Sequence, residues 1–347
     1  MSRKLLSYTT IGLILGSTAI ADVPKVAVDI APVHSLVARV MDGVGSPKLV
    51  IPAGASPHEY SLRPSEAKSL QDADMIIWIG EDLAPWMENS IETLSKNAEV
   101  ITLLKESGTK LLEFREGALF EEHDHGDRDD HDDHDDHDEH DDHDDHDDHD
   151  KDHDDHDEHD DHDKEHDDHD DHDDHAHGEH DPHAWLSIEN AQTWLNLVAG
   201  KLSAADPDNA GVYFANAAAA REEINDLVVE VNSILQPVRG RNFVVFHDAY
   251  QYFETSFNFP AAGAISLGDA TDPSAARIAE IQGRVKDEGI NCVLSEPQYN
   301  ANLVATVLSG TDAKTGVIDP LGLGLEPGPK LYGDLIRNMA KALAGCL

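Results

Sequence analysis

The chain has only two cysteines and few basic residues. Cys292 and Cys346 are the sole cysteines among 347 residues, and 25 Lys and Arg stand against 70 Asp and Glu. No basic stripe of the kind that phosphate backbones require is present, so nucleic acid is not an expected partner. After the N-terminal segment, no apolar run is long enough to span a bilayer, so we expect no direct membrane insertion.

The two cysteines have two interpretations. In an oxidising compartment a lone pair usually forms a disulfide, and this one would close a loop of 55 residues. The chain-entropy model gives such a bridge about 4 kcal/mol of stabilisation. Two free or metal-binding thiols are the alternative, but a thiolate site would need more sulfur or a nearby His. We therefore predict a disulfide between Cys292 and Cys346.

The first residues have the pattern of a secretory signal. Arg3 and Lys4 form a basic start, Ile11 to Ile20 form a short apolar stretch, and Ala19-Ile20-Ala21 is a small-x-small cleavage site. Glycine, serine and threonine interrupt the stretch, which is too short for a bilayer with about 30 Å of hydrocarbon. We expect residues 1–21 to be removed and the mature protein to be exported.

Most of the net charge of −45 comes from one segment. Between Glu121 and Asp181 lie 36 acidic and three basic residues, a net of −33, which leaves −12 for the rest of the chain. Residues 121–180 repeat Asp-Asp-His with scarcely an apolar side chain. Such a segment buries too little surface to offset its ordering entropy, so we predict a disordered loop.

Short apolar runs alternate with amphipathic stretches on both sides of this loop. The pattern favours mostly parallel, helix-covered sheets. We predict an α/β fold of two (β/α) lobes joined by one long helix, which would permit only a small relative motion of the lobes. The expected domains are the signal peptide 1–21, an N-terminal lobe 22–186 that includes the loop 121–180, linking helices 187–238, and a C-terminal lobe 239–347.

The expected elements follow the same alternation. In the first series we predict strands at 25–30, 48–51 and 75–79, and helices at 33–41, 64–71 and 83–94. Helices at 188–204 and 210–235 come next. The second series takes strands and helices in turn at 242–246, 248–256, 261–267, 273–288, 292–295, 300–308, 314–318 and 329–344.

Outside the acidic loop the chain has four histidines. His34 lies alone in a predicted helix, where a structural role is the simpler interpretation. His58, His183 and His247 each lie where a strand or extended segment gives way to a loop. Ligand crevices of open α/β sheets lie beyond the carboxyl ends of the strands. Three imidazoles that converge there would suit Zn²⁺, which prefers nitrogen ligands in a tetrahedron.

The fourth position of such a site has several candidates. Asp319 follows the strand-like segment 315–318, so it too lies at a carboxyl end of a strand. It could bind the metal, accept a hydrogen bond from a ligand imidazole, or leave the position to water. Glu59 is a weaker candidate, because adjacent residues in an extended segment point apart.

Four segments together resemble one family. They occur in order over nearly the whole mature chain, with the acidic His-rich insertion before the second and with the cysteine pair. The segments are Gly54-Ala-Ser-Pro-His-Glu-Tyr-Ser-Leu-Arg-Pro-Ser65, Asp181-Pro-His-Ala-Trp-Leu-Ser187, Phe246-His-Asp-Ala-Tyr-Gln-Tyr-Phe253 and Ile318-Asp-Pro-Leu-Gly322. With them, the chain is similar to the ZnuA family of periplasmic zinc-binding receptors, which belongs to the metal-receptor cluster of ATP-binding-cassette (ABC) importers.

The resemblance implies a periplasmic receptor that holds Zn²⁺ in the cleft between its lobes and delivers it to an inner-membrane ABC permease. It assigns the metal to His58, His183 and His247, and it carries Asp319 as a further candidate ligand. In related manganese receptors a carboxylate replaces the third His, so His247 points to zinc. We expect a monomer.

Other functions compete with this interpretation. A zinc hydrolase would need a general base and an open coordination position, but no His-Glu-x-x-His helix occurs, because the position four after His58 is Leu62. No nucleophile elbow or phosphate loop occurs either, so we expect no enzyme. A zinc buffer would need no two-lobed fold. A receptor for manganese or iron stays open.

The acidic loop holds 19 of the 23 histidines. Many combinations of its imidazoles and carboxylates could hold Zn²⁺ loosely. Our hypothesis is that the loop is an auxiliary zinc collector that passes ions to the cleft. The alternative is a solubilising spacer with incidental metal affinity.

Overall fold

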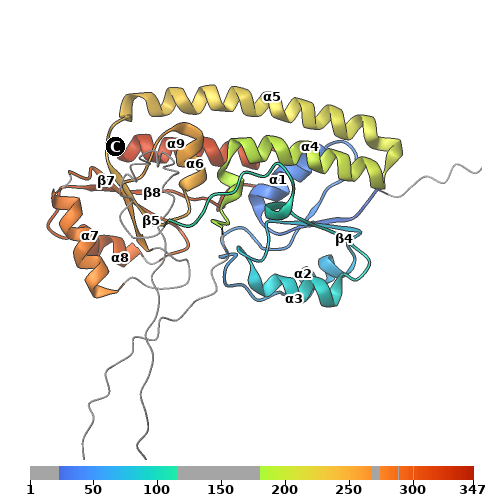
Figure 1. Ribbon diagram of the computed structural model, residues 1–347, viewed down its shortest axis with the longest axis horizontal. Coiled ribbons are helices and arrows are strands. Elements are labelled where there is room, and N and C mark those ends of the chain that lie inside the picture. Colours follow the sequence, from blue (N-terminus) through green and yellow to red (C-terminus); the bar gives the residue numbers. More distant parts are fainter. Residues whose placement is uncertain (1–22, 116–179, 267–273, 288, 300) are drawn as a thin grey trace, which may run out of the picture. The chain divides into compact units, whose positions relative to one another are not determined.

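The computed structural model describes residues 23–115, 180–266, 274–287, 289–299 and 301–347 (Figure 1). The predicted signal peptide therefore lies outside the described residues. The same holds for the predicted loop 121–180, apart from His180. In the described residues, no helix has the length and apolar character to cross a membrane.

The first sheet lies in the N-terminal part and has four parallel strands in the order β2-β1-β3-β4. Its central strands β1 and β3 are buried along their whole length, as apolar runs predict for a sheet covered on both faces. The strands are β1 (Val26–Val28), β2 (Lys48–Leu49), β3 (Met75–Trp78) and β4 (Glu99–Thr102). The helices are α1 (Ala31–Val40), α2 (Pro64–Gln71) and α3 (Pro85–Leu94).

The second sheet repeats this order with β6-β5-β7-β8, again with parallel pairs. Its strands are β5 (Phe243–His247), β6 (Gly263–Ser266), β7 (Cys292–Ser295) and β8 (Lys314–Val317). Its helices are α6 (Gln251–Phe257), α7 (Ala275–Asp287), α8 (Ala301–Val307) and α9 (Leu331–Cys346). Two parallel sheets with connecting helices confirm the predicted α/β class.

Two long helices connect the sheets, α4 (Ile188–Ala205) and α5 (Ala210–Leu235). Ser187 caps α4, since its hydroxyl accepts a hydrogen bond from the Asn190 amide at 3.2 Å. Figure 1 shows α5 running along α4 and α9, and α5 also contacts α1. Short 3₁₀ turns flank these elements: η1 (Leu103–Lys105), η2 (Ala184–Leu186), η3 (Pro207–Asn209) and η4 (Gln236–Val238).

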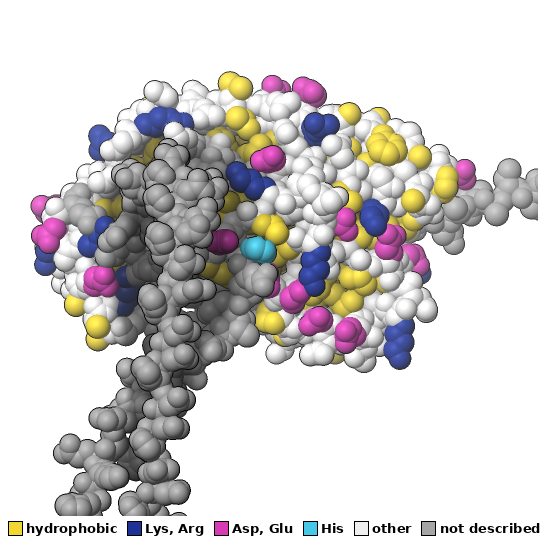
Figure 2. All heavy atoms as spheres, in the orientation of Figure 1, with side chains coloured by type: hydrophobic (Ala, Val, Ile, Leu, Met, Phe, Trp, Pro, Cys, Tyr) yellow, Lys and Arg dark blue, Asp and Glu magenta, His cyan; other side chains and the backbone are white. Residues whose placement is uncertain are grey.

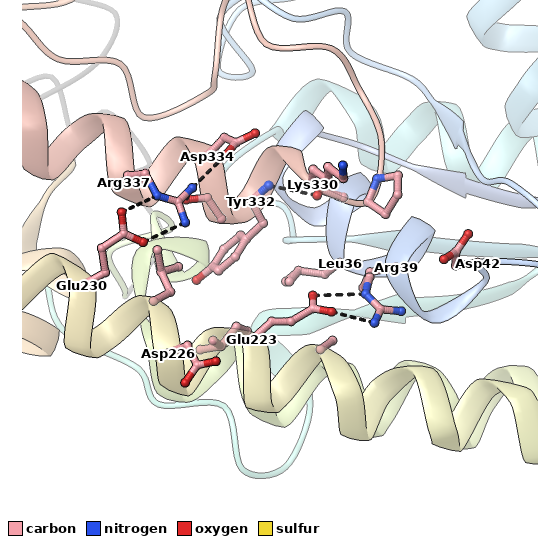
Figure 3. A pocket seen from close by; sticks show the side chains of 16 residues that line it. Leu36, Arg39, Asp42, Glu223, Asp226, Glu230, Lys330, Tyr332, Asp334 and Arg337 are labelled. Atoms are coloured by element: carbon pink, nitrogen blue, oxygen red, sulfur yellow. Dashed lines mark hydrogen bonds and ion pairs between the residues drawn. The ribbon is translucent and has the colours of Figure 1, made fainter.

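Paired charges fasten α5 to one helix from each half of the chain (Figure 3). Arg39 of α1 donates to both carboxylate oxygens of Glu223, at 3.2 and 2.8 Å. Arg337 of α9 does the same with Glu230, at 2.7 and 2.9 Å. A cavity of about 540 Å³ lies beside these pairs, with Tyr332 among its lining residues. The Tyr332 amide donates to the Ser35 hydroxyl at 2.9 Å, so α1 and α9 also touch directly.

The predicted disulfide between Cys292 and Cys346 is confirmed. It joins the first residue of β7 to the last residue of α9, with Cα atoms 5.7 Å apart. The bridge therefore anchors the C-terminal helix to the second sheet.

The described surface carries charges of both signs. Figure 2 shows Lys and Arg side chains scattered among acidic and apolar ones, and the described part of this face has no continuous basic stripe.

Candidate metal centre

Three of the predicted ligands line one small pocket. His58, His183 and His247 share it with Ser56, Pro57, Trp185, Glu296, Gln298, Tyr299, Pro320 and Leu321. The pocket has a volume of about 20 Å³. A single water needs about 10–15 Å³ of such space, so the enclosed space is that of about one ion or one water.

His183 comes from the turn before α4 and is 3% exposed. Asp181 orients it twice, since its Oδ1 lies 2.9 Å from the His183 amide and 2.7 Å from the ring Nδ1. A carboxylate only accepts, so Nδ1 donates, and a neutral ring then has its lone pair on Nε2. Metal-binding imidazoles are commonly oriented in this way by a carboxylate.

His247 is the last residue of β5 and is 4% exposed. Its Nδ1 lies 2.5 Å from Oε1 of Glu296, a buried residue directly after β7. The same reasoning places the lone pair on Nε2. Tyr299 packs against the His247 ring at a centroid distance of 5.2 Å and stacks on Phe246. Neighbouring strands of the second sheet thus supply both the imidazole and the carboxylate that orients it.

His58 lies in the loop between β2 and α2 and is partly exposed. The Trp86 indole donates to the carbonyl of Pro57 at 2.8 Å, which fixes the backbone just before His58. Glu59 points elsewhere, since it is exposed and does not line the pocket. This placement agrees with the expectation that Glu59 is a weaker candidate for the fourth ligand.

Two of the three ring pairs are spaced as rings around one ion would be. Their centroids are 5.6 Å apart for His58 and His183, and 5.3 Å apart for His183 and His247. Rings that share one zinc at 2.0–2.1 Å, in a tetrahedron, have centroids about 5 Å apart. Within the described residues, however, no three His, Cys, Asp or Glu side chains already form a group that could hold a metal. The ligand set therefore stays a prediction that rests on ring spacing and pocket lining.

Asp319 does not line the pocket, although Pro320 and Leu321 beside it do. Its carboxylate accepts hydrogen bonds from the amides of Leu321, at 3.0 Å, and Leu323. The Gln298 side chain donates to it at 3.2 Å. The structure thus places this carboxylate in the turn after β8, and a direct bond to the metal stays a prediction.

Sequence reasoning missed Glu296 as the partner of His247. Its position directly after the buried strand β7 is the signal that could have found it, as it does for His247 and Asp319. For Asp181 the signal is a carboxylate two residues before a buried His, which is well placed to orient the ring.

An ion-pair cluster lies next to the centre. Arg115 donates to Asp248, which follows His247, and to Glu254 of α6, with separations of 2.9 and 2.8 Å for one bond to each. Burial raises the pKa of Asp248 to about 6, although Arg115 opposes the shift. Glu113, two residues before Arg115, pairs with His180 in an isolated antiparallel bridge.

Comparison with known proteins decides the family. A model of the family described as zinc-uptake complex component A, periplasmic, ZnuA, matches residues 26–346. The chain belongs to the ZnuA family. The high-affinity zinc uptake system protein ZnuA of Brucella abortus is 46% identical to this ZnuA-family chain over 332 residues, which cover 96% of this chain and 94% of the relative.

Solved structures share the fold. A crystal structure of ZnuA matches with a TM-score of 0.68 at 20% identity and covers 94% of this chain and 99% of its own. The SBP FpvC of Pseudomonas aeruginosa, solved with Mn²⁺, matches with a TM-score of 0.67 at 17% identity, covering 93% and 97%. Because the same fold occurs with Mn²⁺, the fold alone does not select the metal. Family membership does confirm that this is a transport component and not an enzyme.

Proposed function

We propose that this ZnuA-family protein captures Zn²⁺ in the periplasm and delivers it to an inner-membrane ABC importer. The observation that carries the proposal is one ion-sized pocket lined by His58, His183 and His247, two of which are oriented by carboxylates through Nδ1. Three imidazoles from separate loops suit zinc better than manganese, which prefers oxygen ligands. The signal peptide 1–21 and the lobe boundaries at 186 and 239 belong to the same proposal.

The test is a chelator-competed zinc titration of the full chain beside its His58→Ala, His183→Ala and His247→Ala variants. We expect one tight site in the wild type and its loss in each variant, while the weaker sites of the acidic loop remain. Glu59→Ala is the matched control, since Glu59 adjoins His58 but lies outside the pocket. A tight site that survives all three His substitutions would refute the assignment.

A receptor for manganese or iron is the first alternative. A competition titration of Zn²⁺ against Mn²⁺ and Fe²⁺ separates a zinc receptor from a manganese or iron receptor. A zinc-dependent hydrolase is disfavoured, because the sequence has no His-Glu-x-x-His helix that would place a general base beside the metal.

The acidic loop enters the proposal as an auxiliary zinc collector. Its support is composition alone, with 19 histidines among carboxylates. Deletion of residues 121–180, followed by an uptake assay at limiting zinc, tests this role. We expect slower uptake at low zinc and normal uptake at high zinc. If the deletion variant and the wild type take up zinc equally fast at both concentrations, the loop is only a spacer.

The partners in the proposal are the zinc ion and the ABC permease, and the working state is a monomer. Light scattering of the purified protein, with and without zinc, tests that state. A stable dimer in either sample would contradict it.

A further inference from the structure

Two loops from opposite halves of the chain touch beside the metal pocket. One connects β2 to α2 and supplies Ser56, Pro57 and His58 to the pocket wall. The other connects β8 to α9 and supplies Pro320 and Leu321. The contact between them is made by Gly54 and Leu323. A Cβ placed on Gly54 would lie 2.6 Å from Leu323 Cδ1, so the Leu side chain rests directly on the glycine.

Glycine is suited to this place for two reasons. Its φ of +89° is a conformation that L side chains rarely adopt, and its lack of a Cβ leaves room for the Leu323 methyl group. Leu323 itself is 49% exposed, so only part of its surface is covered by this contact. The pair therefore forms an apolar contact at the rim of the pocket, with solvent on its outer side.

Asp319 fixes the position of Leu323. Its two carboxylate oxygens accept from the amides of Leu321 and Leu323, so the chain folds back over the carboxylate. The turn is closed further by the Leu325 amide, which donates to the Gly322 carbonyl at 3.0 Å. The Trp185 indole donates to the Pro320 carbonyl at 2.8 Å and ties the same turn to the residues beside His183.

A second set of contacts between the two halves of the chain lies away from the metal pocket. The Arg39–Glu223 and Arg337–Glu230 pairs and the Ser35–Tyr332 bond hold α1, α5 and α9 together (Figure 3). The cavity beside them shares no lining residue with the metal pocket. If the halves move about these helices, the loops around the pocket separate, and the Leu323–Gly54 contact breaks with them.

We propose that Asp319 is a positioning residue that holds Leu323 against Gly54, and that this contact is a latch that slows release of the bound ion. The inference rests on the proposed zinc capture. It assigns Asp319 a role in the kinetics of release and leaves the metal bonds to the imidazoles.

The test measures zinc release from the full chain, loaded with one equivalent of Zn²⁺ and mixed with excess chelator. We expect Leu323→Ala and Asp319→Asn each to release zinc about three- to tenfold faster, as loss of a small apolar contact implies. The double variant should release no faster than the faster single variant, because both changes disable the same contact. Val317→Ala, an apolar residue of β8 that is 60% exposed, is the control and should match the wild type.

A second readout separates a positioning residue from a ligand. With Co²⁺ in place of Zn²⁺, the visible spectrum reports the ligand set. We expect the Asp319→Asn spectrum to equal that of the wild type. A changed spectrum, a wild-type release rate in Leu323→Ala, or equally fast release in Val317→Ala would each overturn the latch. Failure of the proposed function is distinct, because the wild type would then show no tight zinc to release.

Discussion

The two sheets have the same strand order, yet they use the ends of equivalent strands differently. β1 and β5 occupy the same place in their sheets, each between the second and third strands of its half. Asp29 follows β1, and its carboxylate accepts from the amides of Ile30 and Ile79, both at 2.7 Å. His247 ends β5 and pairs with Glu296 beyond β7. In both halves a polar residue thus joins the end of the first strand to the end of the third.

Asp29 and His247 differ in what their side chains can do. Asp29 is fully buried, with both oxygens used within the backbone, and burial raises its pKa to about 7. His247 uses Nδ1 for the bond to Glu296, and its ring lines the metal pocket. One topology therefore supplies a structural fastening in the first half and a candidate ligand in the second. The choice of side chain at the strand end decides which.

The largest expected effect comes from replacing the His247 imidazole with a carboxylate. His247→Asp removes a nitrogen ligand and adds an oxygen ligand, which favours harder cations. We expect zinc affinity to fall about a thousandfold or more, while Mn²⁺ affinity falls much less. Competition titrations with both metals measure the ratio. An unchanged ratio of zinc to manganese affinity would show that His247 does not select the metal.

The buried Asp29 carboxyl predicts how the free energy of unfolding depends on pH. Between about pH 4 and pH 7 the folded protein keeps the Asp29 proton that the unfolded chain releases, so ionisation opposes folding. The free energy of unfolding of the wild type should therefore fall, relative to Asp29→Asn, as pH rises from 4 to 7, by up to about 4 kcal/mol. Urea denaturation of both proteins at pH 4.5 and 7.5, with a chelator present, measures this. A difference between the two proteins that does not vary with pH would contradict the account of Asp29.

A smaller effect is expected from the partner of His247. Glu296→Gln keeps an oxygen that can accept from Nδ1 but removes the negative charge that supports the imidazole. Changes of this kind cost about ten- to a hundredfold in metal affinity. Zinc titration gives the number, and thermal unfolding checks that the fold is intact. If Glu296→Gln binds zinc as tightly as the wild type does, the Glu296–His247 pair is only a packing contact.

Much of the fold was predictable because its elements have sharp local signals. Pro64 opens α2, and Pro207 and Gln236-Pro237 flank α5, so both helices have the predicted bounds. The strand β4 was not predicted. Only Ile101 of its four residues is buried, so the edge strand carries too little apolar signal to be read from sequence.

The site was predictable to a similar degree. Histidines at strand ends stood out because so few occur outside the acidic loop, and the structure brings all three to one pocket. The pairing of Glu296 with His247 could not be predicted from local sequence. It depends on the pairing of β5 with β7, and the two residues lie 49 positions apart in the chain. Asp181, by contrast, lies two residues before His183, so local sequence does carry that contact.

The most direct test of the account is a crystal structure of the protein with one equivalent of Zn²⁺, with anomalous scattering measured at the zinc edge. We predict one fully occupied ion with a nitrogen of His58, His183 and His247 each about 2.0–2.1 Å away. A fully occupied zinc elsewhere, or one bound by fewer than these three imidazoles, would contradict the account.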